Sequence, residues 1–261
     1  MIFGTRSPLL EVFAGAGVDS FIINSGARAD ELNLFGEDGN DRFIVDRTTV
    51  DTTTNLFGNQ GNDRFSIGAT ANDDDGNLGL IRGELNIVGG GNTVGGEDQV
   101  FANDNGAQAQ YSYLVTPTRI SAIAGPANLP RDNFVGINYD SSTEFVRLDG
   151  TPLANLFEVV ASSTTRFFFD GNSPNNNVGD RLIVLAQPND GRNLVVTNAV
   201  AGDGFVSFTN GNETIQFENI ELPALDGNST SLTLGEDDSD RDEYFSTIDL
   251  EEVEDIEFFA I

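Results

Sequence analysis

Three aspartates near the start of the chain stand 22 residues apart, each within a glycine-rich turn. They are Asp19, Asp41 and Asp63. Carboxylate and backbone carbonyl oxygens are the ligands that calcium prefers in proteins, and glycine allows the tight turns that present those carbonyls. The pattern therefore indicates calcium sites between stacked turns. The candidate ligands are Asp19, Gly36, Asp38, Gly39, Asp41, Gly58, Gly61 and Asp63.

The same aspartates have a second interpretation, in which each carboxylate only accepts hydrogen bonds within its turn. Stacked carboxylates repel one another, and a bound cation would remove that repulsion. Three more aspartates, Asp98, Asp180 and Asp203, stand alone and are weaker candidates. The acidic runs Asp73–Asp75 and Asp237–Asp240 lack the glycine frame, and the first of them is expected to be a solvated loop.

The composition excludes several kinds of chemistry. The chain has 42 acidic and 13 basic residues, a formal charge of −29, and no His, Cys, Lys or Trp. Serine triads, thiol nucleophiles, ordinary zinc sites and Schiff-base lysines are therefore ruled out. The acidity argues against a nucleic-acid partner, which needs a basic face. No apolar run of about 20 residues predicts membrane insertion.

The elements that position the aspartates follow from the same 22-residue spacing. Two sets of phenylalanines recur with this spacing, and short apolar runs with alternating polarity flank each turn. A strand–helix–strand unit needs about 30 residues. We therefore predict an all-β, right-handed parallel β-solenoid with coils of about 22 residues and inserted loops. The alternative, a sandwich of independent hairpins, does not account for the fixed step. The two sets are Phe13, Phe35, Phe57 and Phe21, Phe43, Phe65.

Two turns carry a recognisable motif. Residues 36–44, Gly-Glu-Asp-Gly-Asn-Asp-Arg-Phe-Ile, and residues 58–66, Gly-Asn-Gln-Gly-Asn-Asp-Arg-Phe-Ser, resemble the repeats-in-toxin nonapeptide Gly-Gly-x-Gly-x-Asp-x-U-x. The resemblance implies a secreted bacterial β-roll whose turns bind calcium between neighbouring coils. It covers about residues 12–67. The chain departs from the motif at its second glycine, where Glu37 and Asn59 stand, and at Ala14 in the first unit.

The unit recurs with insertions later in the chain, after Gly89, Gly150 and Gly171. We predict a first solenoid half over residues 1–147 and a second, related half over residues 148–225. Residues 226–261, with 13 acids and one Arg, are expected to form a C-terminal cap or a connecting segment. The final residues 257–261 resemble the carboxyl-terminal export signal of type I secreted proteins. The alternative interpretation is that residues 257–261 form an edge strand.

Alternation also predicts what faces outward. Ile22 and Ile44 are expected to point away from the core, and Phe35 and Phe57 to form an exposed apolar stripe, unless an inserted loop such as residues 68–84 covers it. Only about ten residues precede the first coil, which is little for a cap. The N-terminal end is therefore expected to abut another domain or another copy of the chain.

The leading hypothesis is a structural protein and not an enzyme. It is an extracellular module of a bacterial surface layer, adhesin or filament, stabilised by calcium and bound to other copies of itself or to neighbouring surface proteins. The alternative is a polysaccharide-active β-helix enzyme, a lyase, epimerase or glycosidase, that uses carboxylates such as Glu144, Glu158 and Glu221. An ice-binding threonine face over residues 48–54 is a third possibility, but one coil alone carries that run.

Overall fold

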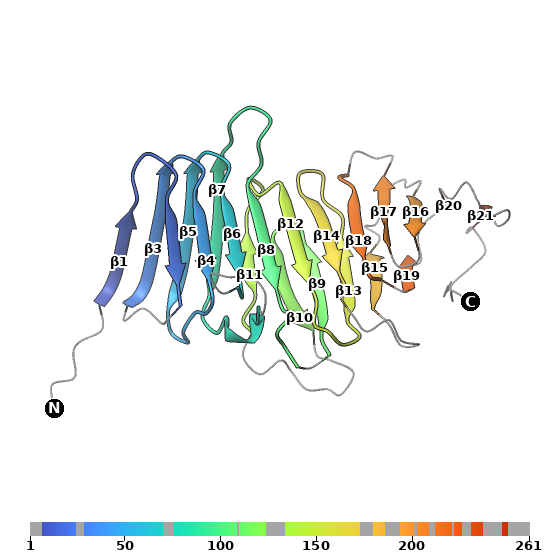
Figure 1. The fold of residues 1–261 in the computed structure, drawn as a ribbon, viewed down its shortest axis with the longest axis horizontal. Helices are drawn as coiled ribbons and strands as arrows, with labels where there is room; N and C mark the ends of the chain where they lie inside the picture. Colours follow the sequence, from blue (N-terminus) through green and yellow to red (C-terminus); the bar gives the residue numbers. More distant parts are fainter. Residues whose placement is uncertain are drawn as a thin grey trace.

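The protein is built from two long β-sheets (Figure 1), as seen in a computed structural model of the chain. One three-residue 3-10 helix, η1 (Leu78–Leu80), lies in the part of the chain that is described. The all-β prediction is confirmed. The described residues are 7–24, 29–69, 76–108, 110–123, 134–172, 180–185, 194–200, 203–208, 212–220, 222–225, 231–236 and 247–249.

Within the described residues, sheet A has ten strands and sheet B has eleven. The order in sheet A is β1 (Ser7–Phe13), β3 (Ala29–Asp38), β5 (Thr53–Gln60), β7 (Leu85–Gly91), β11 (Ile137–Tyr139), β10 (Arg119–Ile123), β9 (Ser112–Thr116), β13 (Leu156–Val160), β15 (Arg181–Leu185) and β19 (Leu222–Leu225). The order in sheet B is β2 (Ser20–Ile23), β4 (Arg42–Val45), β6 (Arg64–Ile67), β8 (Gln99–Asn103), β12 (Phe145–Asp149), β14 (Arg166–Asp170), β18 (Ile215–Glu218), β17 (Asp203–Phe208), β16 (Leu194–Val200), β20 (Ser231–Glu236) and β21 (Thr247–Asp249).

The first strands alternate between the two sheets, and each pairs in parallel with the strand one coil away. In sheet B, Phe43 pairs with Phe21 on one side and Phe65 on the other. In sheet A, Phe35 pairs in the same way with Phe13 and Phe57. Residues 22 apart therefore lie side by side, as the periodicity predicts. Three antiparallel pieces interrupt the parallel order: β9–β10–β11, β16–β17–β18 and β20–β21.

The hydrophobic core lies between the sheets and continues from coil to coil. Phe43 and Phe65 are fully buried, with ring centroids 4.8 Å apart, and Phe21 stacks on Phe43 at 4.9 Å. A second stack, with centroids 4.6 and 4.7 Å apart, joins Phe13, Phe35 and Phe57 on the opposite face of sheet A. Offset aromatic pairs add to the energy of their burial. Both ladders therefore hold the coils together along the axis.

The predicted outward positions are only partly correct. Ile22 is exposed. Ile44 pairs with Ile22 and lies outside the core cluster that contains Phe43 and Val45, but only 3% of its surface is accessible. Phe35 and Phe57 are half-buried, whereas Phe13 in the terminal coil is 59% exposed. Position on a strand therefore sets the direction of these side chains, but a neighbouring coil decides how much of each remains exposed.

The second half of the chain repeats the order of the first with the sheets exchanged. The turns ending in Asp41, Asp63 and Asp98 lead from sheet A to sheet B, whereas those ending in Asn155 and Asp180 lead from sheet B to sheet A. The antiparallel insertion likewise lies in sheet A in the first half and in sheet B in the second. The recurring motif therefore occupies opposite edges of the stack in the two halves.

Candidate functional site

Acidic side chains form a column where sheet A passes into sheet B, each just before a sheet B strand. We name it the turn column; its members are Asp19, Asp41, Asp63, Asp98 and Glu144. The Asp19 amide donates to Asp41 Oδ1 at 2.8 Å, the Asp41 amide to Asp63 Oδ1 at 2.7 Å, and the Asp63 amide to Asp98 Oδ1 at 2.7 Å. The Asp98 amide donates to Glu144 Oε2 at 2.8 Å. Each carboxylate of the column except that of Asp19 thus accepts a backbone amide of the preceding coil.

The second oxygen of these carboxylates faces a glycine. Oδ2 of Asp41, Asp63 and Asp98 is buried and has no hydrogen-bond partner among the described residues. A Cβ on Gly36 or Gly58 would lie 2.2 Å from Oδ2 of the aspartate in its own turn. The same Cβ positions lie 2.9 and 2.4 Å from a backbone carbonyl of the next coil. The φ angles of Gly36 and Gly58 lie outside the left-handed region. Glycine is therefore needed at these two positions because a side chain would not fit, and not because of the backbone conformation.

Other turn positions do require the left-handed region. Gly39 and Gly61 have φ of +146° and +145°, and their amides donate to the next coil. The motif's second glycine position is also left-handed here, although Glu37 and Asn59 occupy it with φ of 73° and 72°. Residues other than glycine lose roughly 1–2 kcal/mol in this conformation. The chain therefore carries backbone strain at both departures from the motif.

Glu37→Gly is expected to stabilise the protein by about 0.5–1 kcal/mol, because it relieves the left-handed strain but adds chain entropy to the unfolded state. Urea denaturation followed by circular dichroism measures this. Asp30→Gly provides the control, since Asp30 is exposed in β3 with no positive φ, and it should lose about 0.5–1 kcal/mol. Equal destabilisation by both changes would contradict the strained turn.

Burial raises the pKa of Asp63 to about 6 and that of Asp98 to about 7, and it also raises the pKa of Asp41. The backbone amide of the preceding coil's aspartate opposes the rise, and the negative charge of that same aspartate adds to it. For Asp98, the nearby Asp63, Glu144 and Asp140 all contribute. Backbone hydrogen bonds therefore hold the column together, whereas burial and the repulsion between its members disfavour the ionised form of the buried carboxyl groups.

Asp98→Asn is expected to flatten the pH dependence of stability. The native state binds the Asp98 proton more tightly than the unfolded chain, so this group's contribution falls as pH rises from about 4 to about 7. An amide can accept the Asp63 N–H without carrying charge. Thermal melts in chelator from pH 4 to pH 8 should show the variant losing less stability than wild type across that window. The control is Asp30→Asn on an exposed carboxylate, and a slope for Asp98→Asn equal to wild type would refute the burial argument.

A neutral member of the same motif already exists in the second half of the chain. Asn155 takes the aspartate's place, and a Cβ on Gly150 would lie 2.8 Å from its Nδ2. Its backbone N–H and Nδ2 donate to Asp180 Oδ1 at 2.6 and 2.8 Å. Asp180 is fully buried beside Gly171. The geometry of the turn therefore accommodates an amide as well as a carboxylate.

The predicted calcium ligands are brought together in part. Asp19, Asp41 and Asp63 share the turn column, whereas Asp38 is exposed at the end of β3. No group of three His, Cys, Asp or Glu side chains able to hold a metal occurs in the described residues. The donor chemistry nevertheless fits a hard cation, because the buried Oδ2 atoms lack partners and backbone carbonyls lie beside them. A cation here would use about one carboxylate oxygen per coil and several carbonyls or waters.

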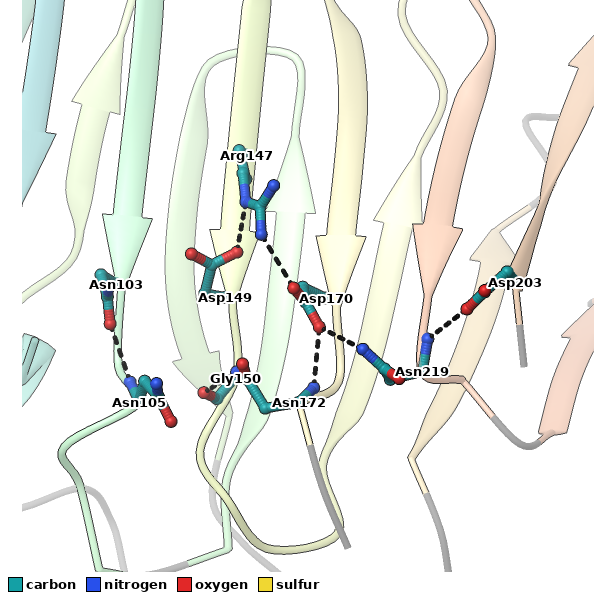
Figure 2. A network of polar contacts seen from close by, with 9 residues as sticks. All are labelled: Asn103, Asn105, Arg147, Asp149, Gly150, Asp170, Asn172, Asp203 and Asn219. Carbon is teal, nitrogen blue, oxygen red and sulfur yellow. Dashed lines mark hydrogen bonds and ion pairs between the residues drawn. The ribbon is translucent and has the colours of Figure 1, made fainter. Parts of the chain in front are cut away.

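A second polar network, which the sequence analysis missed, lies at the opposite edge (Figure 2). Arg147 on β12 bridges Asp149 at 2.5 Å and Asp170 on β14 at 2.8 Å. Asp170 Oδ1 also accepts from the Asn172 amide and from Asn219 Nδ2. Burial raises the pKa of Asp149 to about 6, although Arg147 lowers it. The shared order apolar–Asp–Gly at residues 148–150 and 169–171 was the available signal.

An asparagine ladder on sheet A was missed as well. Asn55 donates to Asn33 at 2.7 Å, Asn86 to Asn55 at 2.8 Å, and Asn138 to Asn86 at 2.8 Å. Arg119 donates to Asn138 at the end of the ladder. Only the first step keeps the 22-residue spacing. Inserted loops lengthen the later steps, so spacing alone did not reveal them.

The remaining candidates are dispersed or lie outside the described residues. Glu144 binds Asn92 and the Asp98 amide, whereas Glu158 lies in the middle of β13 on the other sheet. Thr48, Thr52 and Thr54 are buried, so the threonine run is not a flat exposed face. The calls outside the described residues are Glu221, Asp73–Asp75, Asp237–Asp240 and residues 257–261. Most of the segment 226–261 also lies outside the described residues. Asp203, which is described, accepts a hydrogen bond from the Asn219 backbone amide.

Comparison of the chain with protein-family models, curated proteins and solved structures found no match. Within the described residues, no helix is long and apolar enough to cross a membrane. Conclusions about function therefore rest on the residues and geometry of this chain itself.

Proposed function

We propose that the chain is an extracellular structural module of a bacterial surface layer, adhesin or filament. The observation that carries the proposal is the in-register stacking of coils, with a column of carboxylates hydrogen-bonded from each coil to the next. In such a stack each coil contacts only its neighbours, so repeated coils extend the molecule along one axis. Its function is then mechanical and adhesive.

In this proposal the two sheets are the faces of a right-handed parallel β-solenoid. Each coil consists of one sheet A strand and one sheet B strand, as in β3–β4 followed by β5–β6. A strand that returns to the same sheet in parallel after a crossover does so with right-handed connectivity in nearly all proteins. That rule, together with the alternation of the first strands, supports the handedness.

An extracellular position at a bacterial surface is supported by the composition and by the motif. A charge of −29 with no Lys suits a calcium-rich medium outside the cell, where cations screen the carboxylates. The two turns at residues 36–44 and 58–66 resemble secreted repeats-in-toxin modules. Calcium is the proposed partner of the turn column, and other copies of the chain are the proposed protein partner.

Calcium addition to the purified full chain tests this proposal. Negative-stain microscopy should show filaments or sheets in millimolar calcium, and chelation with EDTA should disperse them and lower the melting temperature. The triple variant Asp19→Asn, Asp41→Asn, Asp63→Asn should lose the calcium response while keeping the fold, as Asn155 does in its own turn. A melting temperature that EDTA leaves unchanged, together with a monomer in calcium, would overturn the proposal.

A further inference from the structure

The N-terminal end of the stack exposes side chains that other coils bury. Leu10 is 45% exposed, whereas its partner in the next coil, Leu32, is 6% exposed. Val12 is 39% exposed, whereas Leu34 beside it is 4% exposed. The end surface, as we name it, contains six of the large apolar side chains that are exposed in the described residues: Leu9, Leu10, Val12, Phe13, Val18 and Ile22.

The hydrogen-bonding groups of this end are also left open. Among the described strands, β1 pairs only with β3 and β2 only with β4, so each sheet ends there in an edge strand. Asp41, Asp63 and Asp98 each accept an amide of the preceding coil, but no described residue donates to the Asp19 carboxylate. Edge strands and exposed apolar surface together form a template for pairing with another chain.

The occupant that fits is the downstream edge of another coil. Inside the chain, that edge supplies an amide to the aspartate, an aromatic ring to each ladder and apolar side chains to the core. Among the described strands, sheet A ends at β19. This strand runs in the same direction as β1, because all the strands of sheet A except β10 share one direction. Figure 1 shows β1 at one end of the stack and β19 toward the other.

We propose that the end surface binds the β19 end of a second copy of this chain by parallel strand addition, so that copies associate head to tail. The inference rests on the self-association in the proposed function and adds its surface, partner and polarity. Head-to-tail contacts generate open filaments when the rotation from one copy to the next does not close a ring. The new interface repeats the coil-to-coil contact already present along the chain.

Sedimentation velocity of the full chain tests the inference, in millimolar calcium and about 150 mM salt to screen the repulsion between acidic copies. Wild type should associate with rising concentration. Leu10→Lys with Val12→Lys should require about tenfold higher concentration or more, because two charges would be buried at the interface. Both side chains are already substantially exposed in the monomer. The matched control is Val94→Lys. Val94 lies in a turn and its side chain is fully exposed, so this variant should associate as wild type does.

Three further outcomes would overturn the inference. Filaments formed equally by wild type and by the Leu10→Lys, Val12→Lys variant would place assembly on another face, while the proposed function stands. A monomeric wild type that associates only after deletion of residues 1–6 would show that the chain covers its own end. A single Val18→Cys, the only thiol in such a variant, should not give disulfide-linked dimers, since their formation would show that two N-terminal ends meet.

Discussion

Gly61→Ala is expected to destabilise the protein by about 4 kcal/mol or more. The added Cβ would lie 1.6 Å from the Gly39 carbonyl oxygen, a backbone atom that cannot rotate away, and the residue has φ of +145°. Left-handed strain alone accounts for about 1–2 kcal/mol of this, and the clash must separate two coils. Chemical denaturation of the full chain measures the loss.

Gln60→Ala is the matched control for Gly61→Ala. Gln60 occupies the same turn but is exposed, so its truncation should change the stability by no more than about 0.5 kcal/mol. Partial unfolding of the first coils alone would appear as a second transition and would still support the clash. A Gly61→Ala protein within about 1 kcal/mol of wild type would show that neighbouring turns do not approach each other as closely as described.

Phe65→Ala is expected to destabilise the protein by about 3–5 kcal/mol. Phe65 is fully buried between the sheets and stacks on Phe43, with ring centroids 4.8 Å apart. Its removal leaves a cavity between the sheets, where strand pairing holds the coils on both sides in place and they cannot collapse into it. Urea denaturation with tyrosine fluorescence or circular dichroism gives the free energy of unfolding.

The same substitution in the outer ladder isolates the effect of the core. Phe57→Ala removes the same number of atoms from the same coil and breaks a similar stack, 4.7 Å from Phe35. Because Phe57 is half-buried, we expect a loss of only about 1–2 kcal/mol. Equal losses for the two variants would mean that the outer face of sheet A is covered by something other than solvent.

Protons and calcium are expected to compete for the turn column. The Oδ2 atoms of Asp41, Asp63 and Asp98 are buried without a hydrogen-bond partner in the described part of the chain, and burial raises the pKa of each group. Either a proton or a cation offsets the charge that burial disfavours. Stabilisation by calcium should therefore be larger above about pH 7 than below about pH 5.

The sequence by itself determined the spacing of the coils and what stacks on what. Residues at equal intervals along the chain must recur at equal positions when each coil has the same length, so Phe21, Phe43 and Phe65 lie in one column. The turn glycines were found in the same way, and the structure then showed that Gly39 and Gly61 have a positive φ whereas Gly36 and Gly58 do not. These features depend only on local turn chemistry and on contour length.

Only the tertiary structure decided how the repeated groups are used. Register across the sheets joins Asn86 to Asn138 despite the loops inserted between them, and it places Asp149 beside Asp170 where Arg147 bridges both. It also assigns Asp41 Oδ1 to an amide of another coil and buries Ile44. Such contacts depend on which strands become neighbours, and inserted loops of unequal length remove that information from the spacing along the chain.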